Sequence, residues 1–230
     1  MIQLKMRVKR MSLKGDNQMI VLSGTIGAGK TSLTTLLAGH LNAPAFYESV
    51  DDNQILPLFY KDPKKYAFLL QIYFLNKRLD SIKEASNNKY SVMDRSIFED
   101  SLLFHLNADL GRSTDIEVQT YDSLLENMLQ QIPNSKFQKT PDLLIYISVS
   151  FDTMLKRIKK RGRSYEQIDN DASLYDYYHE LNQRYRSWYE KYDLSPKIEI
   201  DGDKYDFVTN EKAQKAVIKL LDEKIKEVLG

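Results

Sequence analysis

The chain has 230 residues, of which 42% are hydrophobic and 28% are charged, a composition typical of a globular protein with one substantial core. Its 33 lysines and arginines nearly balance 32 aspartates and glutamates, which argues against a nucleic-acid-binding protein. Cysteine is absent, which excludes disulfides and thiolate metal sites, and no apolar stretch is long enough to span a bilayer.

Residues 1–18 are basic and lack the apolar region of a secretory signal. We interpret them as a flexible N-terminal extension that precedes a single domain of residues 19–230. Met11 and Met19 are alternative starts. Without a signal or a membrane segment, the expected location is the cytoplasm.

Short apolar runs then alternate with longer helical patterns. The runs that predict strands are Met19–Ser23, Ala45–Glu48, Ser91–Asp94, Asp142–Val149 and Lys197–Asp201. Such alternation predicts an α/β fold, with a central parallel sheet of about five strands flanked by helices.

Helices are expected in four stretches. Residues 31–41 follow a glycine loop, and Thr114 with Glu117 has the spacing of a capping box, ahead of apolar residues that repeat at helical spacing as far as Ile132. Residues 217–228 show one apolar helix face. The tyrosine-rich run 175–192 reads as an amphipathic helix whose aromatics suit a core or a dimer contact.

The glycine loop fits the pattern G-x-x-x-x-G-K-[ST], between a predicted strand and a predicted helix. Its backbone N–H groups can cradle phosphate, Lys30 can reach the β- and γ-phosphates, and Thr31 can offer a hydroxyl to Mg²⁺. The expected ATP-binding residues of this loop are Gly24, Thr25, Ile26, Gly27, Ala28, Gly29, Lys30, Thr31 and Ser32.

Two absences favour a small-molecule kinase among proteins with this loop. Asn76-Lys77 does not continue into the guanine-reading N-K-x-D pattern of GTPases. The apolar run ending at Val149-Ser150 has no acidic residue where a motor ATPase would place its Mg²⁺-binding aspartate.

Charged residues end two predicted strands, and ligands of parallel sheets bind beyond these ends. Glu48 is placed to hold or take the proton of a hydroxyl acceptor, and Arg95 to offset charge on the moving phosphoryl group. Asp94 is a candidate Mg²⁺ ligand together with Thr31, or an assisting base. The alternative is that these residues only cap helices.

Three arginines, Arg157, Arg161 and Arg163, lie within seven residues. We expect them to form a lid over ATP, within a polar flap of about residues 159–171. The alternative is a solvated basic helix end.

In these motifs the chain resembles the deoxyribonucleoside kinases, most closely the bacterial deoxyadenosine/deoxyguanosine kinases. The resemblance runs from Met19 nearly to the C-terminus. It rests on GTIGAGKT from Gly24, FYESV around Glu48, LFYKDP around Tyr60, LLQIYFLNKR from Leu69, DRSIFED from Asp94 and RIKKRGRSYEQ from Arg157. Ser49 and Gln54 depart from prolines that many relatives carry, at positions without chemical roles.

The resemblance implies a P-loop kinase fold and a role for each matching residue. Glu48 and Arg95 would act at the 5′-hydroxyl, and Asp94 would be the acidic residue of the family's D/E-R-S motif. Substrate contacts would come from Tyr60 and Glu166 at the sugar 3′-hydroxyl, Gln71 at the base edge, and Arg78 with Asp100 as a further base-contacting pair. Tyr73, Phe74 and Phe98 could sandwich the base or pack in the core.

The sequence therefore predicts phosphorylation of deoxyadenosine or deoxyguanosine, with deoxycytidine as a further acceptor, at the 5′-hydroxyl by ATP and Mg²⁺. The resemblance also implies a homodimer and feedback inhibition by a deoxynucleoside triphosphate. From the charge balance and the lack of a long apolar stretch we expect no nucleic-acid or membrane partner. One alternative is a nucleoside monophosphate kinase similar to thymidylate kinases, and another is a non-catalytic nucleotide sensor.

Overall fold

The computed structural model describes residues 17–48, 50, 52–131 and 140–230. Within them a single sheet contains β1 (Gln18–Ser23), β2 (Ala45–Phe46), β3 (Tyr90–Asp94), β4 (Leu143–Ser148) and β5 (Lys197–Asp201). The strand order is β2-β3-β1-β4-β5, and each neighbouring pair is parallel. The predicted parallel α/β sheet is confirmed.

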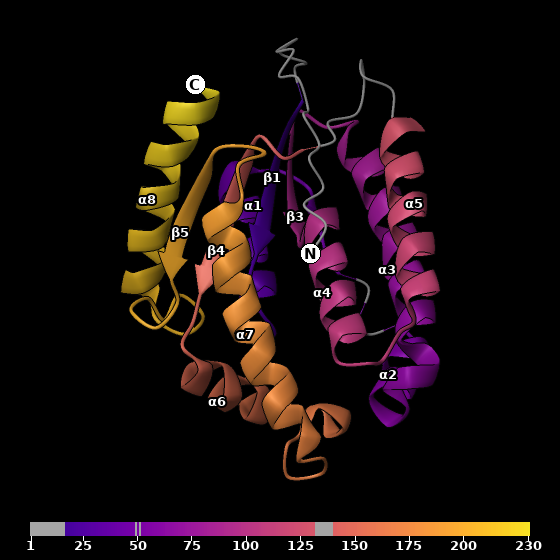
Figure 1. Ribbon diagram of the computed structural model, residues 1–230. Helices are drawn as coiled ribbons and strands as arrows, with labels where there is room; N and C mark the ends of the chain where they lie inside the picture. Colours follow the sequence, from indigo (N-terminus) through magenta and orange to yellow (C-terminus); the bar gives the residue numbers. More distant parts are fainter. Residues whose placement is uncertain (1–16, 49, 51, 132–139) are drawn as a thin grey trace.

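Helices cover both faces of this sheet (Figure 1). They are α1 (Lys30–Leu41), α2 (Ile55–Lys61), α3 (Pro63–Ala85), α4 (Ile97–Asp109), α5 (Asp115–Gln131), α6 (Phe151–Arg161), α7 (Ser173–Lys191) and α8 (Glu211–Leu229), with a short 3₁₀ turn η1 (Ser164–Glu166). Alternate residues of β1 serve opposite layers, since Ile20 and Leu22 pack in one apolar cluster and Met19 and Val21 in another. Burial on both faces explains why β1 reads as a continuous apolar run.

The expected helices are present. The capping box ahead of α5 forms as predicted: the Thr114 N–H donates to Glu117 Oε2 at 2.7 Å, and the Glu117 N–H donates to Thr114 Oγ1 at 3.3 Å. Ile132, the last residue of the predicted pattern, lies outside the described residues. In α7 the side chains of Tyr177 and Tyr178 are buried, so part of the tyrosine run belongs to the core.

Several boundaries differ from the sequence expectation by one or two residues, and the differences at β1 and β2 are described here. Gln18 was assigned to the extension, but it pairs with Tyr90 and begins β1. The strand expected as far as Glu48 ends at Phe46. Its partner β3 continues to Asp94, one residue beyond the Met93 that pairs with Phe46, and Arg95 then adopts φ 78° while its N–H donates to the carbonyl oxygen of Leu22 in β1 at 2.8 Å.

The predicted flap of residues 159–171 contains regular structure. Its first residues form the last turn of α6, which ends where Gly162 adopts a left-handed conformation. The turn η1 follows and brings Glu166 to a buried position. Whether this segment moves as a lid stays a prediction.

No helix in the described ranges is both long and apolar enough to cross a membrane.

Candidate active site

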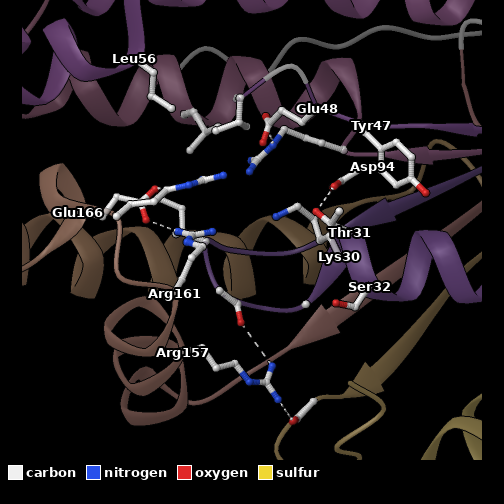
Figure 2. A pocket seen from close by; sticks show the side chains of 18 of the residues that line it. Lys30, Thr31, Ser32, Tyr47, Glu48, Leu56, Asp94, Arg157, Arg161 and Glu166 are labelled. Atoms are coloured by element: carbon white, nitrogen blue, oxygen red, sulfur yellow. Dashed lines mark hydrogen bonds and ion pairs between the residues drawn. The ribbon is translucent and has the colours of Figure 1, made fainter. Parts of the chain in front are cut away.

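A cavity of about 1060 Å³ opens beyond the carboxyl ends of β1 and β3. It is larger than a single small ligand requires, so it has room for a nucleoside and a nucleotide together. The predicted site residues that line it are Ile26, Gly27, Gly29, Lys30, Thr31, Ser32, Glu48, Tyr60, Gln71, Asp94, Arg95, Arg157, Arg161, Arg163 and Glu166. Figure 2 shows Glu166 with Arg161 on one side of this cavity and Thr31 with Asp94 on the other.

The glycine loop forms the tight turn that its sequence pattern predicts. Gly24 has φ 148°, and a Cβ atom there would lie 2.7 Å from the carbonyl oxygen of Ile147, so only glycine fits. Gly27 and Gly29 also have positive φ. The loop leads directly into α1, whose first N–H groups have no side-chain cap and remain available to an anion.

Lys30 lies folded back on this loop. Its Nζ donates to the carbonyl oxygens of Gly24 and Thr25 at 2.9 and 3.1 Å. Burial and the nearby charge of Arg95 lower the pKa of Lys30 to about 8, although neighbouring carboxylates oppose the shift. A bound phosphate would therefore meet an ammonium group that has been desolvated but not neutralised by an ion pair.

Thr31 and Asp94 offer adjacent oxygen atoms. The Thr31 hydroxyl donates to Asp94 Oδ2 at 2.6 Å, and Asp94 Oδ1 is buried without a hydrogen-bond partner. Hydroxyl and carboxylate oxygens are ligands that Mg²⁺ prefers, so this pair fits the ion. Among the described residues no group of three acidic, histidine or cysteine side chains could hold a metal, so phosphate and water oxygens would have to complete the shell.

Glu48 is held between two buried arginines. Its Oε1 lies 2.7 Å from Arg95 Nε and 3.5 Å from Arg78 Nη2. Burial alone would raise the pKa of Glu48, but the charges of Arg95, Arg78 and Lys30 outweigh it and leave the pKa below its usual value. The carboxylate is therefore ionised at neutral pH.

Arg95 is fixed from two other directions. Its backbone has φ 78°, a left-handed conformation that costs a non-glycine residue about 1–3 kcal/mol and that recurs at functional sites. Its Nη1 donates to the hydroxyl of Tyr185, which is fully buried in α7. One member of the tyrosine run thus positions a site residue, a role the sequence did not indicate.

The far end of the cavity suits a nucleoside. Tyr60 stands with its ring 5.1 Å from that of Tyr165, and burial raises its pKa well above the usual value, so it keeps its hydroxyl proton. Gln71 is 3% exposed, and its Oε1 has no hydrogen-bond partner. An amide oxygen in this position needs a donor from a ligand.

Arg78 and Asp100 form the expected pair, but they do not line the cavity. Arg78 Nε lies 3.1 Å from Asp100 Oδ2, and Arg78 Nη1 donates to the carbonyl oxygen of Asp94 at 2.7 Å. Both side chains are buried behind Glu48 and the Asp94 turn. Of the three aromatics considered for base stacking, only Phe74 is among the lining residues.

The three lid arginines have different partners. Arg157 Nη1 donates to the carbonyl oxygen of Ala28 at 2.8 Å, and its Nη2 to that of Gly202 at 2.7 Å. Arg161 Nη2 lies 2.5 Å from Glu166 Oε2, and Arg163 Nη1 lies 3.5 Å from Glu166 Oε1. Glu166 therefore lines the cavity and pairs with two of the arginines predicted to form a lid.

Several lining residues were not anticipated. Gly202, Asp203, Asp206, Val208 and Thr209 come from the loop between β5 and α8 and close the cavity beside the phosphate loop. The signal that could have found them is their position directly after a predicted strand of the parallel sheet.

Comparisons with known proteins identify the family that this chain resembles. The model of the deoxynucleoside kinase family matches residues 20–226. A deoxyguanosine kinase and a deoxyadenosine kinase of Lactobacillus acidophilus are 58% and 59% identical, over 91% and 92% of this chain and 91% and 98% of their own lengths. A structure of deoxyadenosine kinase from M. mycoides with bound dATP is 29% identical with a TM-score of 0.73, covering 90% of this chain and all of that one.

Proposed function

This chain belongs to the deoxynucleoside kinase family, and we propose that it transfers the γ-phosphate of ATP to the 5′-hydroxyl of deoxyadenosine or deoxyguanosine, with deoxycytidine as a further acceptor. Phosphorylation of a deoxynucleoside follows from the family. The observation that supports transfer to the 5′-hydroxyl is the ionised Glu48. It forms an ion pair with Arg95 at the wall of a cavity that is also lined by Lys30 and the phosphate loop.

In the proposed mechanism Glu48 accepts a hydrogen bond from the 5′-hydroxyl and takes its proton as the oxygen attacks the γ-phosphorus. Its lowered pKa makes it a weak base, so its main contribution is to hold and orient the hydroxyl. Lys30, Arg95 and the lid arginines Arg157, Arg161 and Arg163 stabilise charge on the phosphoryl oxygens.

We assign Thr31 and Asp94 to Mg²⁺, because their oxygen atoms are adjacent and one carboxylate oxygen has no other partner. When bound, Mg²⁺ neutralises part of the phosphate charge and fixes the phosphate orientation.

For the acceptor, Tyr60 and Glu166 would hold the sugar 3′-hydroxyl and Gln71 would read the base edge. Arg78 and Asp100 support Glu48 from behind, and they reach a base only if the wall around Glu48 shifts. The relatives named for deoxyguanosine and deoxyadenosine are almost equally similar to this chain, so overall identity does not rank the two bases.

Further parts of the proposal concern assembly and control. A homodimer, a cytoplasmic location and a basic extension followed by one domain with a lid at about residues 159–171 all remain proposals. Feedback by a deoxynucleoside triphosphate is supported by the M. mycoides relative, which was solved with bound dATP.

A phosphoryl-transfer assay tests the proposal directly. ATP and Mg²⁺ are supplied with each of the four deoxynucleosides and with the matching monophosphates. We expect turnover on a purine deoxynucleoside and none on any monophosphate. The thymidylate-kinase-like alternative, which the comparisons do not favour, requires the reverse result.

A further inference from the structure

Glu99, which had no assigned role, is a buried carboxylate beside the site. It lies in the first turn of α4 with a relative exposure of 0%. Its Oε2 accepts the N–H of Ser96 at 2.8 Å, and its own N–H donates to Ser96 Oγ at 3.2 Å. This is a complete capping box, and the spacing S-x-x-E is its sequence signal.

The second carboxylate oxygen of Glu99 accepts a hydrogen bond that a helix cap does not require. Glu99 Oε1 accepts the N–H of Gly24, the first glycine of the phosphate loop, at 3.3 Å. The capping box of α5 offers a contrast within the same chain. There Glu117 uses one oxygen for both of its contacts with Thr114, and the contacts are exposed.

The charge of Glu99 is expensive to bury. In the described part of the chain no cationic side chain comes within ion-pair distance of it, so backbone N–H groups are its close partners. Burial raises its pKa, while Arg95, Lys30 and the two N–H groups oppose that shift. A solvated glutamate or a glutamine would close the cap without this desolvation cost, so helix capping alone does not account for the residue.

The contact with Gly24 connects Glu99 to Lys30 through a single residue. Gly24 gives its N–H to Glu99, and its carbonyl oxygen accepts from Lys30 Nζ at 2.9 Å. On the other side, Ser96 directly follows Asp94 and Arg95 in the chain. Glu99 therefore connects the loop that carries Lys30 to the turn that carries the proposed Mg²⁺ ligand and the arginine of the acceptor end.

We propose that Glu99 is a positioning residue for phosphoryl transfer. It bonds the phosphate loop to the Asp94–Arg95–Ser96 turn and so fixes Lys30 relative to Asp94 and Arg95. The inference rests on the proposed function, since it assigns chemical roles to Lys30, Asp94 and Arg95. A misplacement of about 1 Å in such groups can cost about 100-fold in rate.

The test compares Glu99→Gln with Glu117→Gln. In the first variant one carboxylate oxygen becomes an NH₂ group that cannot accept an N–H, so one of the two bridges is lost. The second makes the same chemical change in the capping box that does not touch the site. Initial rates give kcat and KM for both substrates, and urea unfolding monitored by circular dichroism gives the free energy of unfolding.

We expect Glu99→Gln to lower kcat about 10- to 100-fold and to change the deoxynucleoside KM less than about threefold. Its free energy of unfolding should stay close to that of wild type, because the lost bridge is offset by removal of a buried charge. Glu117→Gln should keep the wild-type kcat. If Glu99→Gln does not fold, Glu99→Asp is used, with the same expected loss of kcat, because its side chain is one methylene too short to reach both N–H groups.

Equal kcat values for the folded Glu99 variant and Glu117→Gln would overturn the inference and leave Glu99 as a helix cap. A loss of activity that merely follows the fraction of unfolded protein would overturn it as well. A wild-type enzyme without transfer to any deoxynucleoside would instead remove the proposed function, so the two failures are distinguishable.

Discussion

Replacing Glu48 with glutamine should separate turnover from ATP binding. Glutamine keeps the size of the side chain and one hydrogen-bond acceptor, but it loses the charge and the basicity. General-base assistance contributes about 10²–10⁴-fold, and the low pKa of Glu48 places it toward the lower part of that range. We therefore expect kcat to fall about 10²–10³-fold while the affinity for ATP changes little.

The same substitution should also lower stability. Arg78 keeps Asp100 as a partner 3.1 Å away, whereas Arg95 loses the carboxylate that lies 2.7 Å from its Nε. Leaving this buried guanidinium with a poorer partner should lower the free energy of unfolding by about 1–3 kcal/mol. Glu190→Gln is the control, because Glu190 forms an exposed pair with Arg186 that is worth less than about 1 kcal/mol.

The stability loss has a defined pH dependence. The folded-state pKa of Glu48 lies below its ordinary value of 4.5, so the stabilisation by its charge is fully present above about pH 4.5 and is lost as pH falls through the folded-state pKa. Urea unfolding of wild type and Glu48→Gln should converge as the solution is acidified. Wild-type kcat in a folded Glu48→Gln protein would refute the assignment of Glu48, and a stability gap that widens in acid would refute the electrostatic reasoning.

Three other predictions concern the metal ligands, the phosphate-loop lysine and the sugar contacts. Asp94→Asn should raise the Mg²⁺ concentration needed for half-maximal activity about tenfold or more, whereas a simple drop in kcat at unchanged Mg²⁺ dependence would argue against ligation. The pKa of Lys30, about 8 in the empty enzyme, should rise beside a triphosphate, so ATP binding about one pH unit above 8 should take up a proton. Proton uptake makes the calorimetric binding enthalpy vary with the ionisation enthalpy of the buffer. Equal binding enthalpies in all buffers would contradict this prediction. Wild type should have a lower kcat/KM for 2′,3′-dideoxynucleosides than for deoxynucleosides, because Glu166 contacts the 3′-hydroxyl. Glu166→Gln should bring the two kcat/KM values closer together. An unchanged ratio of these two values would place the 3′-hydroxyl elsewhere.

The strand-end argument predicted the centre of the site from sequence. Ligands of parallel sheets bind beyond the carboxyl ends of the strands, and the structure brings Glu48, Asp94 and Arg95 together there. The glycine loop was equally predictable, because its pattern specifies both the turn and the helix that follows.

Contacts made by long side chains between distant elements were less accessible. Arg157 and Arg161 lie four residues apart on α6, yet one bonds to the phosphate loop and the other to Glu166. The divergence arises because Gly162 ends the helix and η1 folds back beneath its last turn. The spacing of the arginines in the sequence contains no information about a segment that returns in this way.

The burial of Arg78 could not be predicted for a related reason. In the sequence Arg78 stands among polar residues, and only the packing of α3 against α4 and β3 turns it toward Asp100 and the Asp94 carbonyl oxygen. Its partners come from another helix and from a strand end, and their relative positions depend on the whole layer.

The left-handed backbone at Arg95 has a genetic consequence. Glycine adopts φ 78° without strain, and every arginine codon is a single base change from a glycine codon. One single-base route to the loss of this guanidinium therefore leads to a residue that the main chain accepts readily. Selection against it must act on the side chain itself, through its contacts with Glu48 and Tyr185 and through the reaction that they serve.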